Sequence, residues 1–170
     1  MRLAFVCLFL AALACSSAKK DEDKAAAPAE AAASPAQGGF TEYQRKSKAT
    51  EAKVSLNAIA RGVKVYYVEN GKLPPAAALV PPAGACCKTE AKACAPEPSA
   101  WTGPGWNEIM FSLSDPHRYS YELVTSAAGF TARAVGDLDC DGVFATYELA
   151  GTIQDGAVTT GPLSEKDPLE

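Results

Sequence analysis

Residues 41–75, TEYQRKSKATEAKVSLNAIARGVKVYYVENGKLPP, carry the strongest secondary-structure signal in this chain of 170 residues. Apolar side chains recur in this stretch at spacings of three and four residues, which is the period of one helix face. They are Val54, Leu56, Ile59, Ala60, Val63, Tyr66 and Tyr67. Thr41 and Gln44 have the form of a capping box at a helix start. The Asn-Gly pair at 70–71 and the prolines at 74–75 are a stop signal. The stretch predicts one long N-terminal amphipathic helix whose apolar face needs a covering layer.

Shorter stretches later in the chain predict that layer. Residues 119–123 and 130–135 alternate apolar with polar side chains, as half-buried strands do, and residues 143–149 form a third strand. Residues 106–111 and 156–160 are two further candidate strands. We therefore expect an α+β fold, in which the helix packs on a small antiparallel sheet of three or four strands.

The composition argues against several classes of function. A formal net charge of −4 provides no basic surface, so nucleic acid is not an expected partner. The single histidine, His117, is interpreted as a turn residue and argues against histidine-dependent catalysis. The sequence offers no Ser/His/Asp or Cys/His set, so we expect neither catalytic residues nor a small-molecule substrate. A small periplasmic metal-dependent enzyme is the alternative from another class.

The N-terminus has the form of an export signal. Arg2 precedes an apolar run of twelve residues, which is too short to span a bilayer and is typical of a signal peptide. The run ends in small residues before Cys15, and this pattern resembles the lipobox of bacterial lipoproteins. The resemblance implies that residues 1–14 are a lipoprotein signal peptide, that Cys15 is the lipidation site and that the protein lies in the cell envelope. Ser16 after the cysteine favours the outer membrane. An ordinary signal peptide, cut near Ala14 or Ala18, is the alternative.

Residues 15–39 predict a lipid-anchored disordered tether. They are rich in alanine with interspersed prolines, and they end in a Gly-Gly pair. Such a segment lacks the large apolar side chains that offset the entropy cost of ordering. Residues 40–170 are then the globular domain, held off the membrane by the tether.

An ordered series of short motifs in the helix resembles type IV pilins and secretion pseudopilins, in the part that follows their membrane helix. The series is Lys46-Ser47-Lys48, Glu51-Ala52, Leu56-Asn57, Ala58-Ile59, Tyr66-Tyr67 and Gly71-Lys72-Leu73-Pro74. Residues 106–111, 119–121, 129–132 and 136–142 resemble the sheet half of the same proteins. The resemblance covers about residues 40–150 and implies a pilin-like fold.

The chain departs from that family where the filament core would form. Pilins start with Gly-Phe-Thr-Leu-x-Glu and continue with about twenty apolar residues that anchor the subunit. Here Gly39-Phe40-Thr41 imitates that start, but Gln44 stands at the position of the glutamate, and Arg45, Lys46 and Lys48 stand where the filament core would need aliphatic residues. The resemblance implies a pilin-like head behind a lipid anchor, which is non-enzymatic and acts in surface assembly, adhesion or secretion-system interaction. The expected partners are the membrane and pilus or secretion-system proteins. A minor pilin or pseudopilin that associates with a filament is the alternative.

The cysteines after the tether predict a stapled loop. Residues 76–105 are rich in proline and contain three of the cysteines that form an even set. The set is Cys86, Cys87, Cys94 and Cys140. A bond between Cys86 and Cys87 would close a strained ring. Two full pairings remain. The first joins Cys87 to Cys94 and Cys86 to Cys140. The second joins Cys86 to Cys94 and Cys87 to Cys140. Each bridge typically contributes 2–4 kcal/mol. A zinc site made of the four thiolates is the disfavoured alternative.

Residues 137–148 satisfy the D-x-D-x-D-G-x5-E pattern of calcium-binding loops. Three carboxylates at alternate positions converge when the chain wraps around a centre, and a hard cation such as Ca²⁺ prefers oxygen ligands. The candidate ligands are Asp137, Asp139, Asp141, the Val143 carbonyl and Glu148. The alternative is an Asp/Gly-rich turn that binds nothing. The ion would be structural and would pin two strands together.

Overall fold

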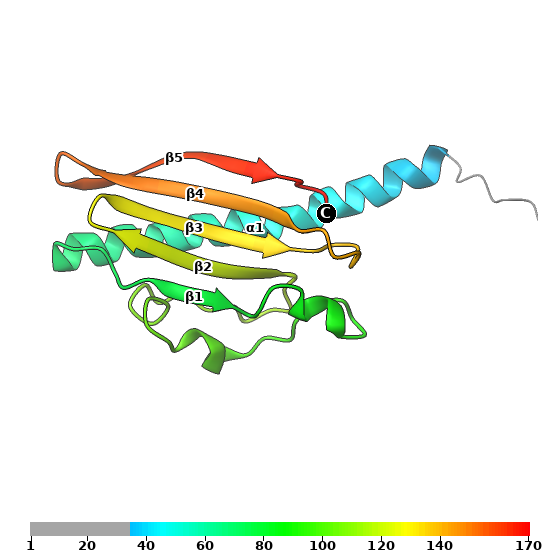
Figure 1. Cartoon of the computed structure of the whole chain (residues 1–170), viewed down its shortest axis with the longest axis horizontal. Helices are drawn as coiled ribbons and strands as arrows, with labels where there is room; N and C mark the ends of the chain where they lie inside the picture. The colour runs from blue at the N-terminus through cyan, green and yellow to red at the C-terminus, as the bar shows by residue number, and fades with distance from the viewer. Residues whose placement is uncertain (1–34) are drawn as a thin grey trace, which may run out of the picture. The chain divides into compact units, whose positions relative to one another are not determined.

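The structure, a computed structural model, describes residues 35–170. One helix precedes five strands in the chain, with two 3-10 turns between the first two strands. They are α1 (Pro35–Asn70), β1 (Ala77–Val80), η1 (Ala85–Lys88), η2 (Pro98–Trp101), β2 (Tyr119–Ser126), β3 (Gly129–Gly136), β4 (Ala145–Gln154) and β5 (Ala157–Lys166). The strands form one antiparallel sheet in chain order, and α1 lies across one of its faces (Figure 1). The predicted α+β class is confirmed, but the expected strand number is wrong, because the sheet has five strands.

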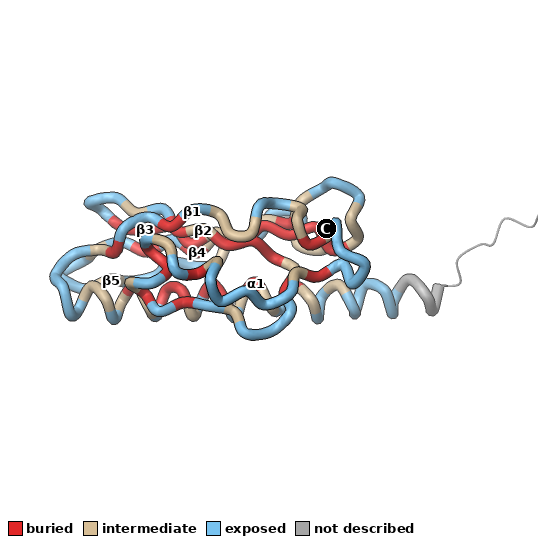
Figure 2. Tube along the Cα trace, turned by 90° about the horizontal axis from the view of Figure 1, so that it is seen from below, coloured by how far each residue is buried: buried red, intermediate tan, exposed pale blue. Residues whose placement is uncertain are grey.

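The core lies between α1 and the sheet (Figure 2). Five buried residues of the helix recur at spacings of three and four: Ala49, Ala52, Leu56, Ile59 and Val63. Alternate residues of the three central strands face them, as the two-residue period of a strand requires. These include the core tyrosines Tyr119, Tyr121 and Tyr147, and also Leu123, Ala132, Ala134 and Leu149.

Two details of the predicted helix are wrong. The helix begins at Pro35, so Thr41 lies inside it and is not its cap. The last five residues of the predicted tether, 35–39, are therefore helical. Val54 is 61% exposed, although its spacing predicts a place on the apolar face. Val54 precedes Leu56 by two residues, which places the two side chains on opposite sides of the helix.

The strand predictions after residue 118 hold for β2, β3 and β4. Strand β5 extends from Ala157 to Lys166, well beyond the predicted residues 156–160. The predicted strand at 106–111 is wrong, because the chain forms successive turns there. Strand β1 was missed because it lies inside the proline-rich stretch that predicted only a loop.

The segment between β1 and β2 contributes to the core. Trp101, Trp106 and Phe111 are buried, and their rings contact one another at centroid distances of 5.3–5.4 Å. The Trp106 indole N–H donates to the Ala78 carbonyl at 3.2 Å, and the Phe111 ring lies 5.8 Å from that of Tyr121. The predicted disulfide staples are present, but large aromatic side chains also anchor this segment in the core, which the sequence did not indicate.

Two disulfides close the same region, Cys86–Cys94 and Cys87–Cys140. The sequence left two pairings open, and the structure has the second of them. The first bridge closes a local loop, and the second connects that loop to the segment between β3 and β4. Because all four cysteines form disulfides, the alternative zinc site of four thiolates is not formed.

The predictions for residues 1–14, for Cys15 and for the tether up to residue 34 lie outside the described residues. Between residues 35 and 170, no helix is both long enough and apolar enough to cross a membrane.

Candidate functional site

The loop of residues 137–144, here called the aspartate loop, connects β3 to β4, and Asp137 organises it. This side chain is 8% exposed, and its carboxylate accepts three backbone hydrogen bonds. The donors are the N–H groups of Cys140 at 2.6 Å, Asp141 at 3.2 Å and Gly142 at 3.0 Å. Positive φ angles at Cys140 (67°) and Gly142 (96°) turn the chain back on itself. The loop therefore wraps around a buried carboxylate.

A cation from the helix reaches the same loop. The Arg45 guanidinium lies 3.0 Å from Oδ2 of Asp139, and its second terminal nitrogen donates to the Leu169 carbonyl at 3.3 Å. Oδ1 of Asp139 is buried and has no hydrogen-bond partner. The sequence did not indicate this contact of Arg45, because spacing along a helix does not show which distant loop a side chain meets.

Three of the predicted metal ligands come together. One carboxylate oxygen from each of Asp137, Asp139 and Asp141 lies within 4.8 Å of the other two. Three oxygens at this spacing suit a hard cation, and the orphaned Oδ1 of Asp139 offers a free lone pair. The three carboxylates could therefore hold a cation, and backbone N–H groups and Arg45 already neutralise part of their negative charge.

The other two predicted ligands are not part of this carboxylate cluster. Glu148 lies within β4, opposite Arg133 of β3 and Ser164 of β5. The alternation along β4 turns Glu148 to the sheet face away from Tyr147, which is the face without the helix. The Val143 N–H donates to Oδ1 of Asp141 at 2.8 Å, so this residue belongs to the loop through its backbone. The calcium pattern therefore located the loop correctly. Its twelfth residue, Glu148, is part of β4 and does not lie with the three aspartates.

A second carboxylate arrangement, which the sequence did not indicate, surrounds the half-buried side chain of Glu51. The Glu51 carboxylate accepts the Arg118 N–H with both oxygens, at 3.0 and 3.1 Å. Its Oε1 also accepts the Tyr119 N–H and the Tyr121 hydroxyl, each at 3.2 Å. Glu51 thus attaches the start of β2 to α1. The position of Glu51 beside the apolar helix face could have indicated a contact with another element. The sequence does not show which backbone groups the carboxylate contacts.

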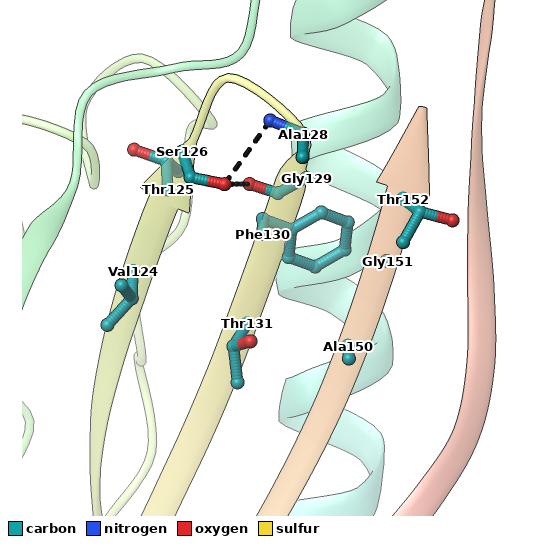
Figure 3. Close-up of a pocket in the computed structure, with 10 residues that line it drawn as sticks. All are labelled: Val124, Thr125, Ser126, Ala128, Gly129, Phe130, Thr131, Ala150, Gly151 and Thr152. Atoms are coloured by element: carbon teal, nitrogen blue, oxygen red, sulfur yellow. Dashed lines mark hydrogen bonds between the residues drawn. The ribbon is translucent and has the colours of Figure 1, made fainter. Parts of the chain in front are cut away.

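A shallow depression lies over the turn between β2 and β3, as Figure 3 shows. Its volume is about 250 Å³, and none of its lining residues carries a titratable side chain. Ser126 organises the turn, since its hydroxyl donates to the Gly129 carbonyl and accepts the Ala128 N–H, each at 3.3 Å. The Phe130 ring lies beside Gly151 on the neighbouring strand. The residues that line this depression therefore provide no group for acid–base catalysis.

The fold and the loop define an α+β protein, with one helix on a five-stranded antiparallel sheet and two disulfides. No protein-family model, curated protein or solved structure matches the chain.

Proposed function

We propose that the chain is a membrane-anchored, non-enzymatic, pilin-like lipoprotein of the cell envelope, which acts in surface assembly, adhesion or secretion-system interaction. The observation that carries the proposal is the arrangement of α1. Its central part packs across the sheet, whereas residues 39–44 at its N-terminal end are all exposed (Figure 2). A head with a helix that continues toward the N-terminus suits attachment from that side.

The sequence of the preceding segment supports the anchor. Cys15 follows a short apolar run and small residues, as in bacterial lipoproteins. Several acyl chains on one cysteine give stable membrane binding, because each buried methylene contributes about 0.8 kcal/mol. The anchor and the tether would then replace the membrane helix of a pilin.

Calcium has a structural role in this proposal. The carboxylates of Asp137, Asp139 and Asp141 would hold the ion, with the Val143 carbonyl as a further ligand. An ion there would fix the connection between β3 and β4. The Arg45 contact would couple the same loop to the helix.

The anchor is tested by intact mass spectrometry of the full chain, produced in a bacterium with an outer membrane. We expect the wild-type protein in the membrane fraction, starting at Cys15 and carrying acyl chains. A Cys15→Ser chain should lose both properties. A wild-type protein that starts after Cys15 without lipid would contradict the anchor.

The partner is tested by photo-crosslinking from two exposed positions of the full chain. Tyr43 lies at the N-terminal end of α1, and Val124 lies on the sheet face away from the helix. We expect a crosslinker at Tyr43, but not at Val124, to capture an envelope assembly or secretion-system component identified by mass spectrometry. Capture of filament subunits would favour the minor-pilin alternative. Crosslinking to neither class would contradict a role in assembly.

A further inference from the structure

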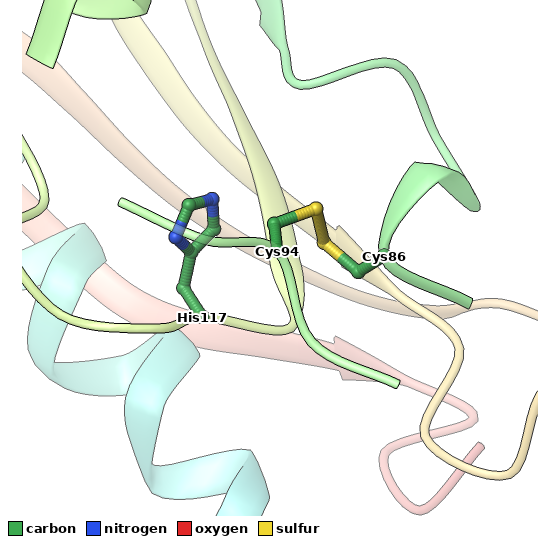
Figure 4. Close-up of side chains that lie close together, drawn as sticks. All are labelled: Cys86, Cys94 and His117. Carbon is green, nitrogen blue, oxygen red and sulfur yellow. A yellow bond between two sulfur atoms is a disulfide. The ribbon is translucent and has the colours of Figure 1, made fainter. Parts of the chain in front are cut away.

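The Cys86–Cys94 disulfide lies against the only histidine of the chain (Figure 4). Cys94 and His117 form an isolated antiparallel bridge, with backbone hydrogen bonds of 2.7 and 3.0 Å in the two directions. One ring nitrogen of His117 and the two sulfur atoms all lie within 4.8 Å of one another. Cys86 and His117 are each only 4% exposed. The predicted turn residue is thus a buried neighbour of a disulfide.

The imidazole has a free lone pair in this position. His117 Nδ1 lies 3.4 Å from the Asp115 carbonyl oxygen, which only accepts hydrogen bonds. This contact favours the proton on Nδ1 and leaves the lone pair on Nε2. Nε2 is buried and has no hydrogen-bond partner. An imidazole oriented through one nitrogen, with the other one free, is the usual state of a metal ligand.

The loop that holds the two cysteines has a backbone frame besides the disulfide. The Thr89 hydroxyl lies 3.0 Å from the Cys86 carbonyl and 2.9 Å from the Ala93 carbonyl, and it accepts the Ala93 N–H at 3.2 Å. The bridge between Cys94 and His117 closes the frame. We therefore expect both cysteines to stay near His117 after the disulfide is reduced.

The other disulfide offers a weaker arrangement of the same kind. Cys87, Cys140 and Asp137 also place one potential ligand atom each within 4.8 Å of one another. However, the Asp137 carboxylate already accepts three backbone N–H groups. His117 Nε2 has no such commitment, so the cluster with the histidine is the better ligand set.

We propose that Cys86, Cys94 and His117 form a zinc site when their disulfide is reduced. A dithiol reductant supplies two electrons and two protons and leaves as a disulfide, which produces two protein thiols. Zn²⁺ then replaces the two thiol protons, which are released, and accepts the lone pair of His117 Nε2. Two thiolates and one imidazole leave the fourth tetrahedral position open. A cavity of about 350 Å³, lined by Cys94, His117 and Trp101, provides access.

The test uses the full chain with Cys7→Ser and Cys15→Ser, called the reference chain. The disulfides are reduced, and the reductant is then removed under anaerobic conditions. The reduced chain is titrated with Co²⁺, which serves as a spectroscopic substitute for Zn²⁺. We expect one equivalent to bind with a thiolate-to-cobalt charge-transfer band, and Zn²⁺ to displace it. The oxidised reference chain should not give this band.

Variants of the reference chain identify the ligands. The double variant Cys86→Ala with Cys94→Ala should lose the charge-transfer band, whereas the double variant Cys87→Ala with Cys140→Ala should keep it. His117→Ala should weaken binding at least about 10-fold and change the visible spectrum. Glu90→Gln, at an exposed position of the same loop, is the matched control and should bind like the reference chain.

Three outcomes of the cobalt titrations would overturn the proposal. They are the absence of binding to the reduced reference chain, unchanged binding without Cys86 and Cys94, and unchanged affinity and spectrum in His117→Ala. Loss of the folded state on reduction, seen by circular dichroism, would also overturn it, because the site requires the loop to stay in place.

Discussion

The substitution Glu51→Gln tests how α1 is attached to the sheet. The carboxylate of Glu51 accepts hydrogen bonds from three donors, the N–H groups of Arg118 and Tyr119 and the Tyr121 hydroxyl. Glutamine keeps the length of the side chain and one acceptor oxygen. It removes the negative charge and turns an NH₂ group toward one of the N–H donors. The change therefore weakens all three contacts without opening a cavity.

The expected loss follows from the number of donors. A hydrogen bond to a charged group contributes about 1.5–3 kcal/mol, and a neutral one about 0.5–1.5 kcal/mol, so each contact loses about 1 kcal/mol. Three contacts give about 3 kcal/mol. Glu51 is only half-buried, and solvent screens part of its charge, so we expect about 2 kcal/mol.

The assay is urea denaturation of the reference chain with its disulfides oxidised, followed by circular dichroism. With a urea slope of about 1–3 kcal/mol per molar, the midpoint should fall by roughly 1 M. Glu69→Gln, at an exposed position of the same helix, is the control and should change stability by less than about 0.5 kcal/mol. If Glu51→Gln behaves like the control, the carboxylate does not hold β2 to the helix.

Three further predictions concern the sheet, alkaline pH and the aspartate loop. Gly151→Ala should cost about 1–3 kcal/mol, because a Cβ there would overlap the Phe130 ring, whereas the Cβ of Gly161→Ala would lie 3.8 Å from the nearest atom. Equal urea midpoints for the two variants would contradict the steric reason. Burial raises the pKa of each core tyrosine above its ordinary value. Their contribution to stability is thus complete below the unfolded pKa of about 10 and is lost as the pH rises above it. The slope should approach about 3 kcal/mol per pH unit, because the pKa rises furthest for two of the three, Tyr119 and Tyr121. A flat stability profile between about pH 9 and 11 would refute this. Calcium at about 100 times its Kd should add about 2.7 kcal/mol to the reference chain and nothing to Asp139→Ala, as measured by urea denaturation with calcium or a chelator. An equal gain in both chains would place the ion elsewhere.

The elements with a regular period could be predicted from the sequence. Leu56, Ile59 and Val63 are buried as their spacing requires, and the alternating residues of β2 and β3 face them. Local patterns succeed here because one face of each element meets the core along its whole length.

Irregular segments could not be predicted in the same way. Trp101, Trp106 and Phe111 enter the core from turns, where side-chain direction follows no fixed period. The short strand β1 is likewise fixed by its partner β2 rather than by its own residues. The same limit applies to the aspartate loop, whose carboxylates the pattern located but whose cation, Arg45, comes from a distant helix.

The motifs of α1 from which the pilin-like proposal starts differ in their contacts. Ala52, Leu56 and Ile59 are buried against the sheet, and Glu51 attaches β2 to the helix. Other members of the series, including Asn57, are exposed. The buried members serve the contact between helix and sheet, which any chain with this architecture requires. They therefore support the fold more directly than the function. The functional part of the proposal depends on features that the core does not demand, namely Cys15, the tether and the exposed start of α1. Loss of membrane attachment in Cys15→Ser would test that part without changing the helix–sheet contact.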